Sequence, residues 1–264
     1  MSSLVYFYNE IVKVLYRGSH RLAVKKAIDY IADEWNRRNI FIIELPTGYG
    51  KTTISLAISL YSVKEELKTI VAYPLRALLE DQYSKKFANP KLIEANIISN
   101  EILGKRYMHN PDSLFLIKPI TLTTIDTLSL TLMGIPPEEL SKVVRYWEGT
   151  SFGSLGHFLF SWGSVVLSNI ICDEVHLIMD TTKSLSFLLA LIKTAIDNNM
   201  HLILMSATLP PKLLKEMLKY LSMKERKKVL LITFKPPRQK SMNVINDIDI
   251  IYVYNQNDPF ITNR

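Results

Sequence analysis

The stretch IFIIELPTGYGKTT, Ile40 to Thr53, decides the fold that the rest of the sequence predicts. It opens with an apolar run typical of a buried strand, turns at Gly48 and Gly50, and continues into a helical segment that starts with Lys51. A strand, a glycine turn, a lysine, a hydroxyl and a helix in this order indicate a phosphate-binding loop. Leu45 stands where the strict pattern G-x-x-x-x-G-K-[ST] has its first glycine, so the interpretation needs support from elsewhere in the chain.

Each residue type in this loop suits phosphate chemistry. Gly48 and Gly50 allow main-chain N–H groups to turn toward phosphate oxygens, and the helix N-terminus adds partial positive charge. We expect Lys51 to reach the β- and γ-phosphates and the Thr52 hydroxyl to hold Mg²⁺. An ordinary strand–turn–helix connection is the alternative, and the coincidence of all the parts argues against it. The expected nucleotide-binding residues are Pro46, Thr47, Gly48, Tyr49, Gly50, Lys51, Thr52 and Thr53.

Composition limits the class of protein. The 264 residues are enough for one large α/β domain or two small ones, and 48% of them are apolar. Lys and Arg outnumber Asp and Glu by 32 to 25, a balance compatible with a nucleic-acid partner that does not by itself establish one. The single cysteine, Cys172, excludes an intrachain disulfide and a cysteine-rich zinc site, which fits a reducing, cytoplasmic location.

Two apolar segments do not have the patterns of targeting or membrane segments. Glu10 and Lys13 interrupt the apolar N-terminus, so we expect no signal peptide. Residues 149–172 contain no Asp, Glu, Lys or Arg, but they are rich in glycine and serine, whereas a spanning helix needs about 20 predominantly apolar residues. We expect a buried helix leading into a buried strand there, and no association with a membrane.

Short apolar runs alternate with amphipathic segments along the chain. Buried strands alternating with helices predict right-handed βαβ units around a mostly parallel sheet, whose ligands lie at the carboxyl ends of the strands. Residues 134–164, interrupted by Pro136 and Pro137, have the least regular pattern. The expected strands are 40–44, 69–73, 95–99, 119–123, 168–172, 201–205, 229–233 and 248–254, and the expected helices are 22–35, 51–62, 75–85, 125–132, 184–196 and 211–221.

An acidic pair follows one of the expected strands. In CDEVH, Cys172 to His176, we expect Asp173 to bind Mg²⁺ and Glu174 to orient and deprotonate an attacking water. His176 is placed to face the γ-phosphate from the other side. Acidic loop residues are common and usually solvated, so the pair gains its weight from the phosphate-binding loop.

A further strand ends in MSATL, Met205 to Leu209. The hydroxyls of Ser206 and Thr208 are expected to bond the DEVH strand end and to couple the nucleotide state to movement. Serine and threonine at a strand end are more often a simple turn or helix cap.

In this order, PTGYGKT, DEVH and SAT resemble motifs I, II and III of superfamily 2 helicases. The resemblance implies a RecA-like, three-layer α/β/α P-loop domain that hydrolyses ATP with Mg²⁺. The first position of motif I is often not glycine in that family, so Leu45 agrees with it. The glutamine that often reads adenine just upstream of motif I is replaced, with Val24 in the corresponding place, and Gln82 lies too far along the chain for that role.

Two more segments extend the resemblance. AYPLRALLEDQY, Ala72 to Tyr83, is similar to motif Ia, and PITLTTIDTL, Pro119 to Leu128, is similar to motif Ib. The resemblance implies nucleic-acid contacts by Pro74 and Arg76 in the first, and by Thr123, Thr124 and Asp126 in the second. Taken singly, the arginine would be a solvated surface residue and the threonines an ordinary strand end.

The wording of motifs Ia and Ib, and an apolar helix running into motif II, resemble the helicase of type I CRISPR systems. That resemblance implies single-stranded DNA and the CRISPR surveillance complex as partners. The five histidines include no adjacent His-Asp pair, so an HD nuclease would be a separate protein. An RNA helicase, a DNA-repair helicase and a binding module without hydrolysis remain as alternatives, the last disfavoured by the complete set of Lys51, Thr52, Asp173 and Glu174.

The same resemblance predicts the domain organisation. Residues 1–38 are expected to be a helical lead-in, 39–240 the first RecA-like domain with an insertion at about 134–164, and 241–264 the start of a linker to a second RecA-like domain. In related enzymes an arginine finger accelerates phosphoryl transfer about 10³- to 10⁵-fold. Since the second domain would supply that arginine, we expect slow hydrolysis by these residues alone.

Overall fold

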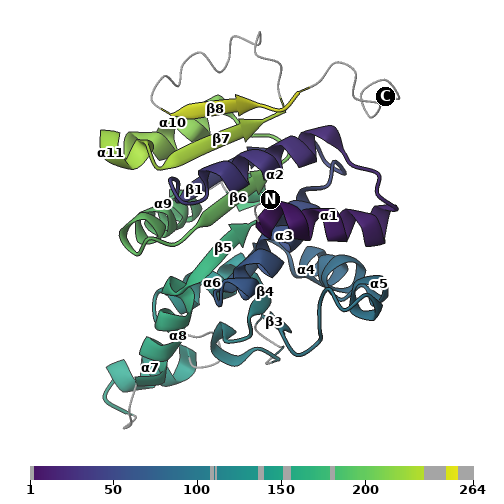
Figure 1. The fold of residues 1–264 in the computed structure, drawn as a ribbon. Coiled ribbons are helices and arrows are strands. Elements are labelled where there is room, and N and C mark those ends of the chain that lie inside the picture. The colour runs from purple at the N-terminus through teal and green to yellow at the C-terminus, as the bar shows by residue number, and fades with distance from the viewer. Residues whose placement is uncertain are drawn as a thin grey trace.

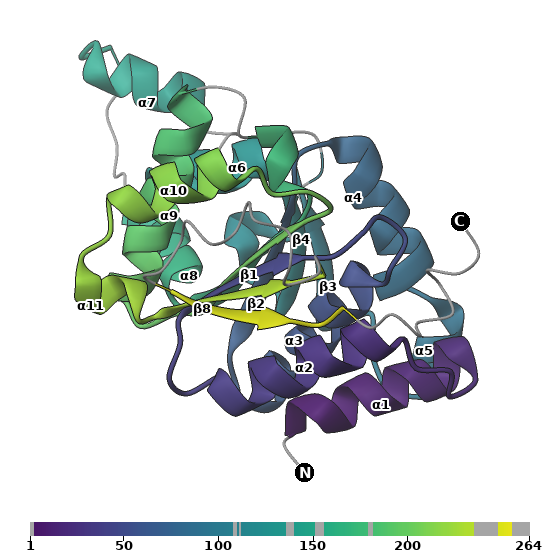
Figure 2. The ribbon, with the colours of Figure 1, turned by 90° about the horizontal axis from the view of Figure 1, so that it is seen from above.

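The computed structural model describes residues 3–107, 110, 112–135, 140–150, 156–178, 182–234 and 248–254. Within these residues eight strands form one sheet in the order β3-β4-β2-β5-β6-β1-β7-β8, and every neighbouring pair is parallel. Helices cover both faces of the sheet (Figures 1 and 2). This is the mostly parallel, three-layer α/β/α fold that the sequence predicts.

The strands are β1 (Ile40–Glu44), β2 (Lys68–Tyr73), β3 (Leu103–Arg106), β4 (Ile120–Thr124), β5 (Ser168–Cys172), β6 (Leu202–Ser206), β7 (Val229–Thr233) and β8 (Asp249–Tyr252). The α-helices are α1 (Ser3–Tyr16), α2 (Leu22–Glu34), α3 (Lys51–Lys64), α4 (Arg76–Gln82), α5 (Pro90–Glu94), α6 (Ile125–Leu132), α7 (Leu140–Trp147), α8 (Gly156–Val166), α9 (Thr182–Asp197), α10 (Pro211–Lys219) and α11 (Met223–Arg226). A π-helix, Tyr83–Phe87, continues α4.

Alternating side chains of the buried strands build two separate cores. In β1, Phe41 and Ile43 face the core beneath α1 to α5, whereas Ile40 and Ile42 face the core beneath α6, α8, α9 and α10. Successive residues of a strand point to opposite faces, so continuously apolar strands need cover on both sides. The first two helices are part of that cover, with α1 packed on α3.

Two expectations need correction. Residues 95–99 form a turn and not a strand, because Asn89 caps the short helix α5 and Asn96, with φ 53°, ends it. The β3 strand follows only at Leu103. Within the irregular range 134–164 the structure has α7 and most of α8.

The helix α8 is also less buried than expected. Its Val165 is fully buried, but Leu159 is 73% and Phe160 60% exposed. Only one side of α8 packs, mainly against α6, so the apolar residues of the other side face outward.

The last strand lies within the segment assigned to a linker. Residues Leu230 to Thr233 of β7 pair with β8, so the sheet extends to Tyr252. The division of the chain into domains stays a prediction. No helix in the described part of the chain has the length and apolar character needed to cross a membrane, and a cytoplasmic location stays a prediction as well.

Strand order places the motifs side by side at the carboxyl edge of the sheet. β1 and β6 end together, with Glu44 opposite Ser206, and β2 and β4 end together, with Tyr73 opposite Thr124. β5 lies between these pairs and ends at Cys172. The loops that follow β1, β5 and β6 are therefore neighbours, and the loops that follow β2, β4 and β3 lie next to them.

Candidate functional site

The cradle forms where β1 turns into α3. Gly48 has φ 75° and Gly50 has φ 106°, backbone conformations that favour glycine. A side chain at Gly50 would also press against Val24, whose Cγ2 atom would lie 3.3 Å from an added Cβ. Tyr49 is buried and its ring packs on Phe234 at a centroid distance of 4.8 Å, so the side chain anchors the loop while the exposed residues Thr47 and Gly48 face outward.

Lys51 links the cradle to the acidic strand end. Its side chain is 6% exposed, and Nζ lies 3.1 Å from Glu174 Oε1. Nζ also donates to the Leu45 carbonyl at 3.4 Å. The ammonium group is thus held at the mouth of the cradle by groups from β1 and from the loop after β5.

The acidic pair sits in a buried and constrained setting. Asp173 is 5% exposed, and burial, reinforced by the nearby charge of Glu174, raises the pKa of its carboxyl to about 6. Its Oδ1 accepts the Glu174 N–H at 2.9 Å. Glu174 has φ 52°, a left-handed conformation that costs free energy in a residue with a side chain. Its Oε2 atom is buried and accepts no hydrogen bond within the described residues.

Ser206 connects motif III to motif II. His176 Nδ1 lies 3.1 Å from Ser206 Oγ and 3.4 Å from Glu174 Oε2. Ser206 Oγ donates its proton to the Thr208 carbonyl at 2.6 Å. The Ser206 oxygen can therefore accept a hydrogen bond from His176 Nδ1 through a lone pair. Thr208 takes part through its main chain, and its own side chain is exposed.

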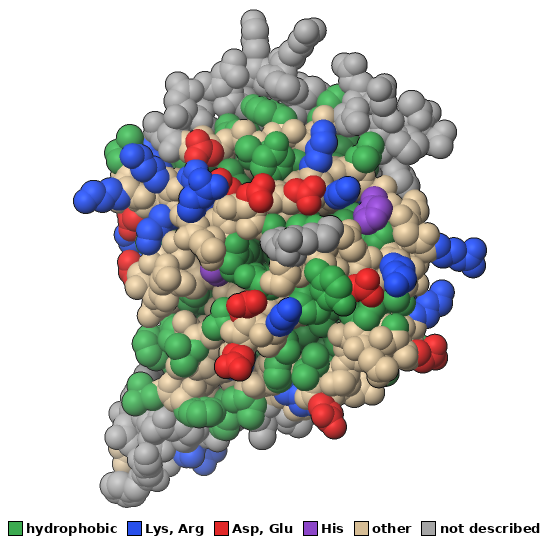
Figure 3. All heavy atoms as spheres, in the orientation of Figure 1, with side chains coloured by type: hydrophobic (Ala, Val, Ile, Leu, Met, Phe, Trp, Pro, Cys, Tyr) green, Lys and Arg blue, Asp and Glu red, His purple; other side chains and the backbone are tan. Residues whose placement is uncertain are grey.

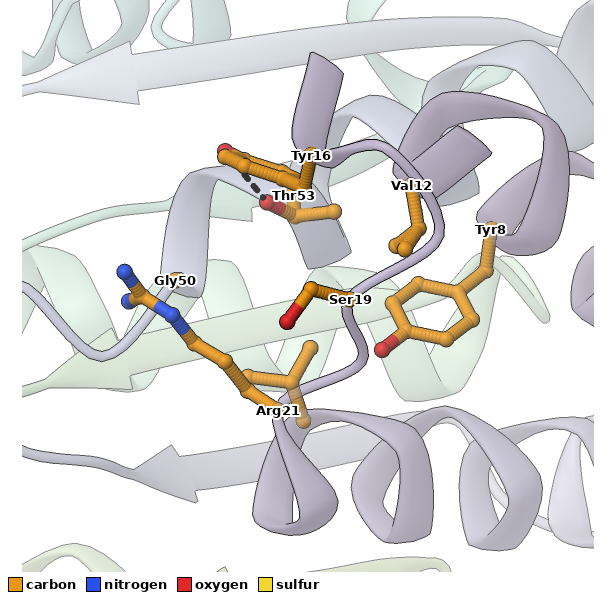
Figure 4. Close-up of a pocket in the computed structure, with 8 residues that line it drawn as sticks. Tyr8, Val12, Tyr16, Ser19, Arg21, Gly50 and Thr53 are labelled. Carbon is orange, nitrogen blue, oxygen red and sulfur yellow. Dashed lines mark hydrogen bonds between the residues drawn. The ribbon is translucent and has the colours of Figure 1, made fainter. Parts of the chain in front are cut away.

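Thr52 and Thr53 point in two different directions from the first turn of α3. Thr52 Oγ1 donates to Gln82 Oε1 at 2.9 Å. Thr53 Oγ1 lies 3.3 Å from the Tyr16 hydroxyl and faces a pocket beside the cradle (Figure 4).

This pocket has a volume of about 210 Å³ and opens next to Gly50. Its lining includes the rings of Tyr8 and Tyr16 from α1 and the side chains of Arg21 and Val24 at the start of α2 (Figure 4). Arg21 also donates to the Gly48 carbonyl, so the residues that precede β1 help to hold the loop. Val24 lines the pocket with an apolar surface.

Sequence reasoning missed two side chains at this edge. Glu44 is 2% exposed, accepts the Leu209 N–H at 2.8 Å and accepts the Thr233 hydroxyl at 2.8 Å. This carboxylate ties the ends of β1, β6 and β7 together below the cradle. A glutamate at the end of an apolar strand was a visible signal, but its donors lie 165 and 189 residues away. Gln82 was noticed and set aside as a base reader, and it contacts Thr52 instead.

The expected nucleic-acid residues differ in their access to solvent. Arg76 is exposed, and its guanidinium lies over the ring of Tyr107 at 4.7 Å. Asp126 is exposed and Thr124 caps α6, its Oγ1 accepting the Thr127 N–H at 3.4 Å. Pro74 is half-buried between β2 and α4.

Thr123 does not fit the expectation. It is fully buried and its hydroxyl donates to the Arg106 carbonyl at 2.6 Å. Its side chain therefore offers no surface to a nucleic acid, and the candidates that remain are Pro74, Arg76, Thr124 and Asp126. On the face shown in Figure 3, basic and acidic side chains are interspersed and form no field of one sign.

Comparison with known proteins identifies the family. The sequence profile of the DEAD/DEAH box helicases matches residues 23–217. This chain belongs to the DEAD/DEAH box helicase family. The match runs from α2 through the cradle, DEVH and SAT into α10. A search among curated proteins found no match.

Two solved helicase structures, those of MrfA and Cas3, share this fold. The DUF1998 helicase MrfA bound to DNA superposes with a TM-score of 0.57 and 16% identity, over 89% of this chain and 32% of MrfA. Cas3 from T. fusca superposes with a TM-score of 0.56 and 13% identity, over 79% of this chain and 24% of Cas3. The UvsW helicase from bacteriophage T4 has 17% identity and a TM-score of 0.44, over 88% of this chain and 59% of UvsW. The chain thus spans only part of each of these helicases.

The residues at the site suit a nucleotide and Mg²⁺. A carboxylate and a hydroxyl are oxygen ligands of the kind that Mg²⁺ takes, and this ion usually completes its shell with water and substrate phosphates. Glu174 Oε2 is buried and accepts no hydrogen bond within the described residues, although His176 Nδ1 lies 3.4 Å from it. Two positive-φ glycines, a lysine and a helix N-terminus make a concave anion site at the same edge.

Proposed function

We propose that this chain is the ATP-binding motor domain of a helicase or translocase that acts on single-stranded DNA. The observation that carries the proposal is the ion pair of Lys51 with Glu174, which brings the phosphate-binding lysine and the candidate base together across two strand ends. A binding module without hydrolysis has no need of that pair next to Asp173.

The proposed roles follow from the contacts. Bound ATP with Mg²⁺ would supply the phosphoryl group that is cleaved. Lys51 would exchange Glu174 for the β- and γ-phosphates, and Thr52 and Asp173 would hold the metal ion. Glu174, freed from the lysine, would accept a proton from the attacking water through its buried carboxylate.

Ser206 and His176 would transmit the change. The ring of His176 contacts both Glu174 and Ser206. Movement of the glutamate would therefore shift His176 and, through it, Ser206 at the end of β6. The pocket beside Gly50 would take the base and ribose, because it begins where the cradle ends. Tyr16 and Arg21 would contact the base there through a ring face and a guanidinium.

The neighbouring half of the sheet edge is proposed to bind the DNA backbone. Arg76 supplies a cation, and the N-terminus of α6 at Thr124 supplies main-chain donors. DNA is favoured over RNA because the MrfA structure that shares this fold was determined with DNA. The wording of the motifs and the fold shared with Cas3 support a role in CRISPR interference, with the surveillance complex and a separate HD nuclease as partners.

Hydrolysis of ATP by the full-length protein tests this proposal. Turnover is measured without nucleic acid, with single-stranded DNA and with single-stranded RNA, for the wild type and for Glu174→Gln. We expect stimulation by DNA above that by RNA, and loss of turnover in the variant. Stronger stimulation by RNA would favour an RNA helicase, and an unchanged Glu174→Gln variant would favour a binding module.

A further inference from the structure

Gln82 connects α4, which carries Arg76, to Thr52 at the start of α3. It is the last residue of α4, the helix that begins at Arg76, and the chain continues directly into the π-helix Tyr83–Phe87. Turns of π-helix are rare and frequently lie at functional sites. The Gln82 side chain reaches across to α3, where its Oε1 accepts the proton of Thr52 Oγ1 at 2.9 Å.

The direction of this hydrogen bond has a chemical consequence. A threonine hydroxyl has one proton and two lone pairs, and a cation can be bound only by a lone pair. Because the proton of Thr52 is donated to Gln82, the lone pairs are turned to the other sides of the oxygen. A partner that holds a ligand in this way is as much a part of a metal site as the ligand itself.

Packing alone does not explain a glutamine here. The buried side chains Leu79 and Phe87 on either side of Gln82 already join this part of the chain to the apolar core. One hydrogen bond between neutral groups adds only about 1 kcal/mol to the stability of the fold. The feature that only an acceptor can supply is the orientation of the Thr52 hydroxyl.

We propose that Gln82 is a positioning residue for Mg²⁺, which holds the Thr52 hydroxyl with its lone pairs toward the ion. The inference rests on the proposed function, since it needs a magnesium nucleotide at the cradle. It assigns a role to a side chain outside the phosphate-binding loop and the DEVH segment. It also means that the helix carrying Arg76 ends at the metal-binding hydroxyl, about 9 Å further along its axis.

Binding of ATP in the presence and absence of Mg²⁺ tests the proposal. The affinity is measured by calorimetry in excess Mg²⁺ and in excess EDTA, for the wild type, Gln82→Leu, Gln82→Glu and Ser84→Ala. The gain in affinity on adding Mg²⁺ should fall about 10- to 100-fold in Gln82→Leu, with the affinity in EDTA unchanged. Gln82→Glu should keep the gain, because a carboxylate oxygen still accepts the proton of Thr52.

The control variant and the contrary outcomes separate this role from a structural one. Ser84 is exposed on the π-helix and its hydroxyl bonds only main-chain oxygens of the preceding turn, so Ser84→Ala should match the wild type. The proposal is overturned if Gln82→Leu keeps the full gain in ATP affinity on adding Mg²⁺, or if it loses as much ATP affinity in EDTA as in Mg²⁺. It is also overturned if Gln82→Glu loses the gain. Gln82→Met, which also removes the acceptor, takes the place of the leucine variant if that variant does not fold.

Failure of the proposed function has a different signature. A wild-type chain that binds ATP in neither condition would remove the nucleotide site itself. If ATP binding depends on Lys51 but the gain in ATP affinity on adding Mg²⁺ is the same in Gln82→Leu as in the wild type, only the role of Gln82 is overturned.

Discussion

The ammonium group of Lys51 lies 3.1 Å from the carboxylate of Glu174, although the two residues are 123 positions apart in the chain. The contact joins the helix after β1 to the loop after β5. Glu174 is held there in a left-handed backbone conformation. The phosphate oxygens of a nucleotide would compete with Glu174 for the Lys51 ammonium group.

A double-mutant cycle should show that these two residues interact. Lys51→Met leaves the largely buried Glu174 charge without its partner, so we expect a loss of roughly 2 kcal/mol in the free energy of unfolding. Glu174→Gln in the same chain should restore part of it, with a coupling of about 0.5–3 kcal/mol. Urea unfolding at constant pH measures all four species, and additivity within about 0.3 kcal/mol would mean that the contact does not form.

Asp173→Asn should stabilise the nucleotide-free protein. The carboxylate is 95% buried from solvent and next to the negative charge of Glu174, and an amide removes the cost of burying it while its Oδ1 still accepts the Glu174 N–H. We expect a gain on the order of 1 kcal/mol and the loss of stabilisation by ATP with Mg²⁺. Thermal unfolding with and without the ligand measures both. A variant less stable than the wild type without ligand would refute this account of the strand end.

Lys68, the first residue of β2, should make the stability of the fold depend on pH. Burial lowers the pKa of Lys68 to about 8, and its ammonium donates to the hydroxyl and carbonyl of Ser164. A lysine whose pKa is lower in the folded state destabilises the fold below that pKa, and the cost disappears as pH rises from about 8 to about 10.5.

Lys68→Met should therefore be more stable than the wild type at pH 7, by on the order of 1 kcal/mol once the partial exposure of the group is considered. The difference should shrink between pH 8 and pH 10. Unfolding in urea at several pH values checks this, and a difference that stays constant with pH would show that the ammonium is not desolvated.

Arg76→Ala should weaken the binding of single-stranded DNA. The guanidinium lies over the Tyr107 ring, and the Tyr107 hydroxyl donates to Glu80 Oε1 at 2.5 Å. The hydrogen bond holds the ring in place, and the ring holds the cation at the sheet edge. We expect the slope of log affinity against log salt to fall by about one. Fluorescence anisotropy with labelled oligonucleotides measures it. Lys85→Ala, which removes an exposed lysine paired with Asp81, is the matched control.

Much of the fold could be predicted from the sequence because its signals are local. The apolar run 168–172 stops at an acidic pair and is β5, and the helix 125–132 begins at a threonine cap and is α6. Residues 95–99 also contain β-branched residues, which favour a strand. The cap at Asn89 and the turn at Asn96 nevertheless fix a short helix followed by a turn. Strand propensity is weak next to such termination signals.

The candidate site, too, was predictable in part. That the loops after β1, β5 and β6 meet follows from a parallel sheet, and the order of the motifs made it predictable. Which side chains face the site depends on contacts between distant segments. Thr123 turns into the core, Gln82 reaches α3, and Glu44 binds donors from β6 and β7, and no local pattern contains that information.

Calorimetric titration of this chain with ATP and Mg²⁺ tests the central claim most directly. The wild type should bind one nucleotide, and Lys51→Ala should bind it about 10- to 100-fold more weakly, since a charge-assisted contact of roughly 1.5–3 kcal/mol is lost. Equal affinities in the two proteins, or no binding by a folded wild type, would contradict the assignment of residues 46–53 as the nucleotide cradle.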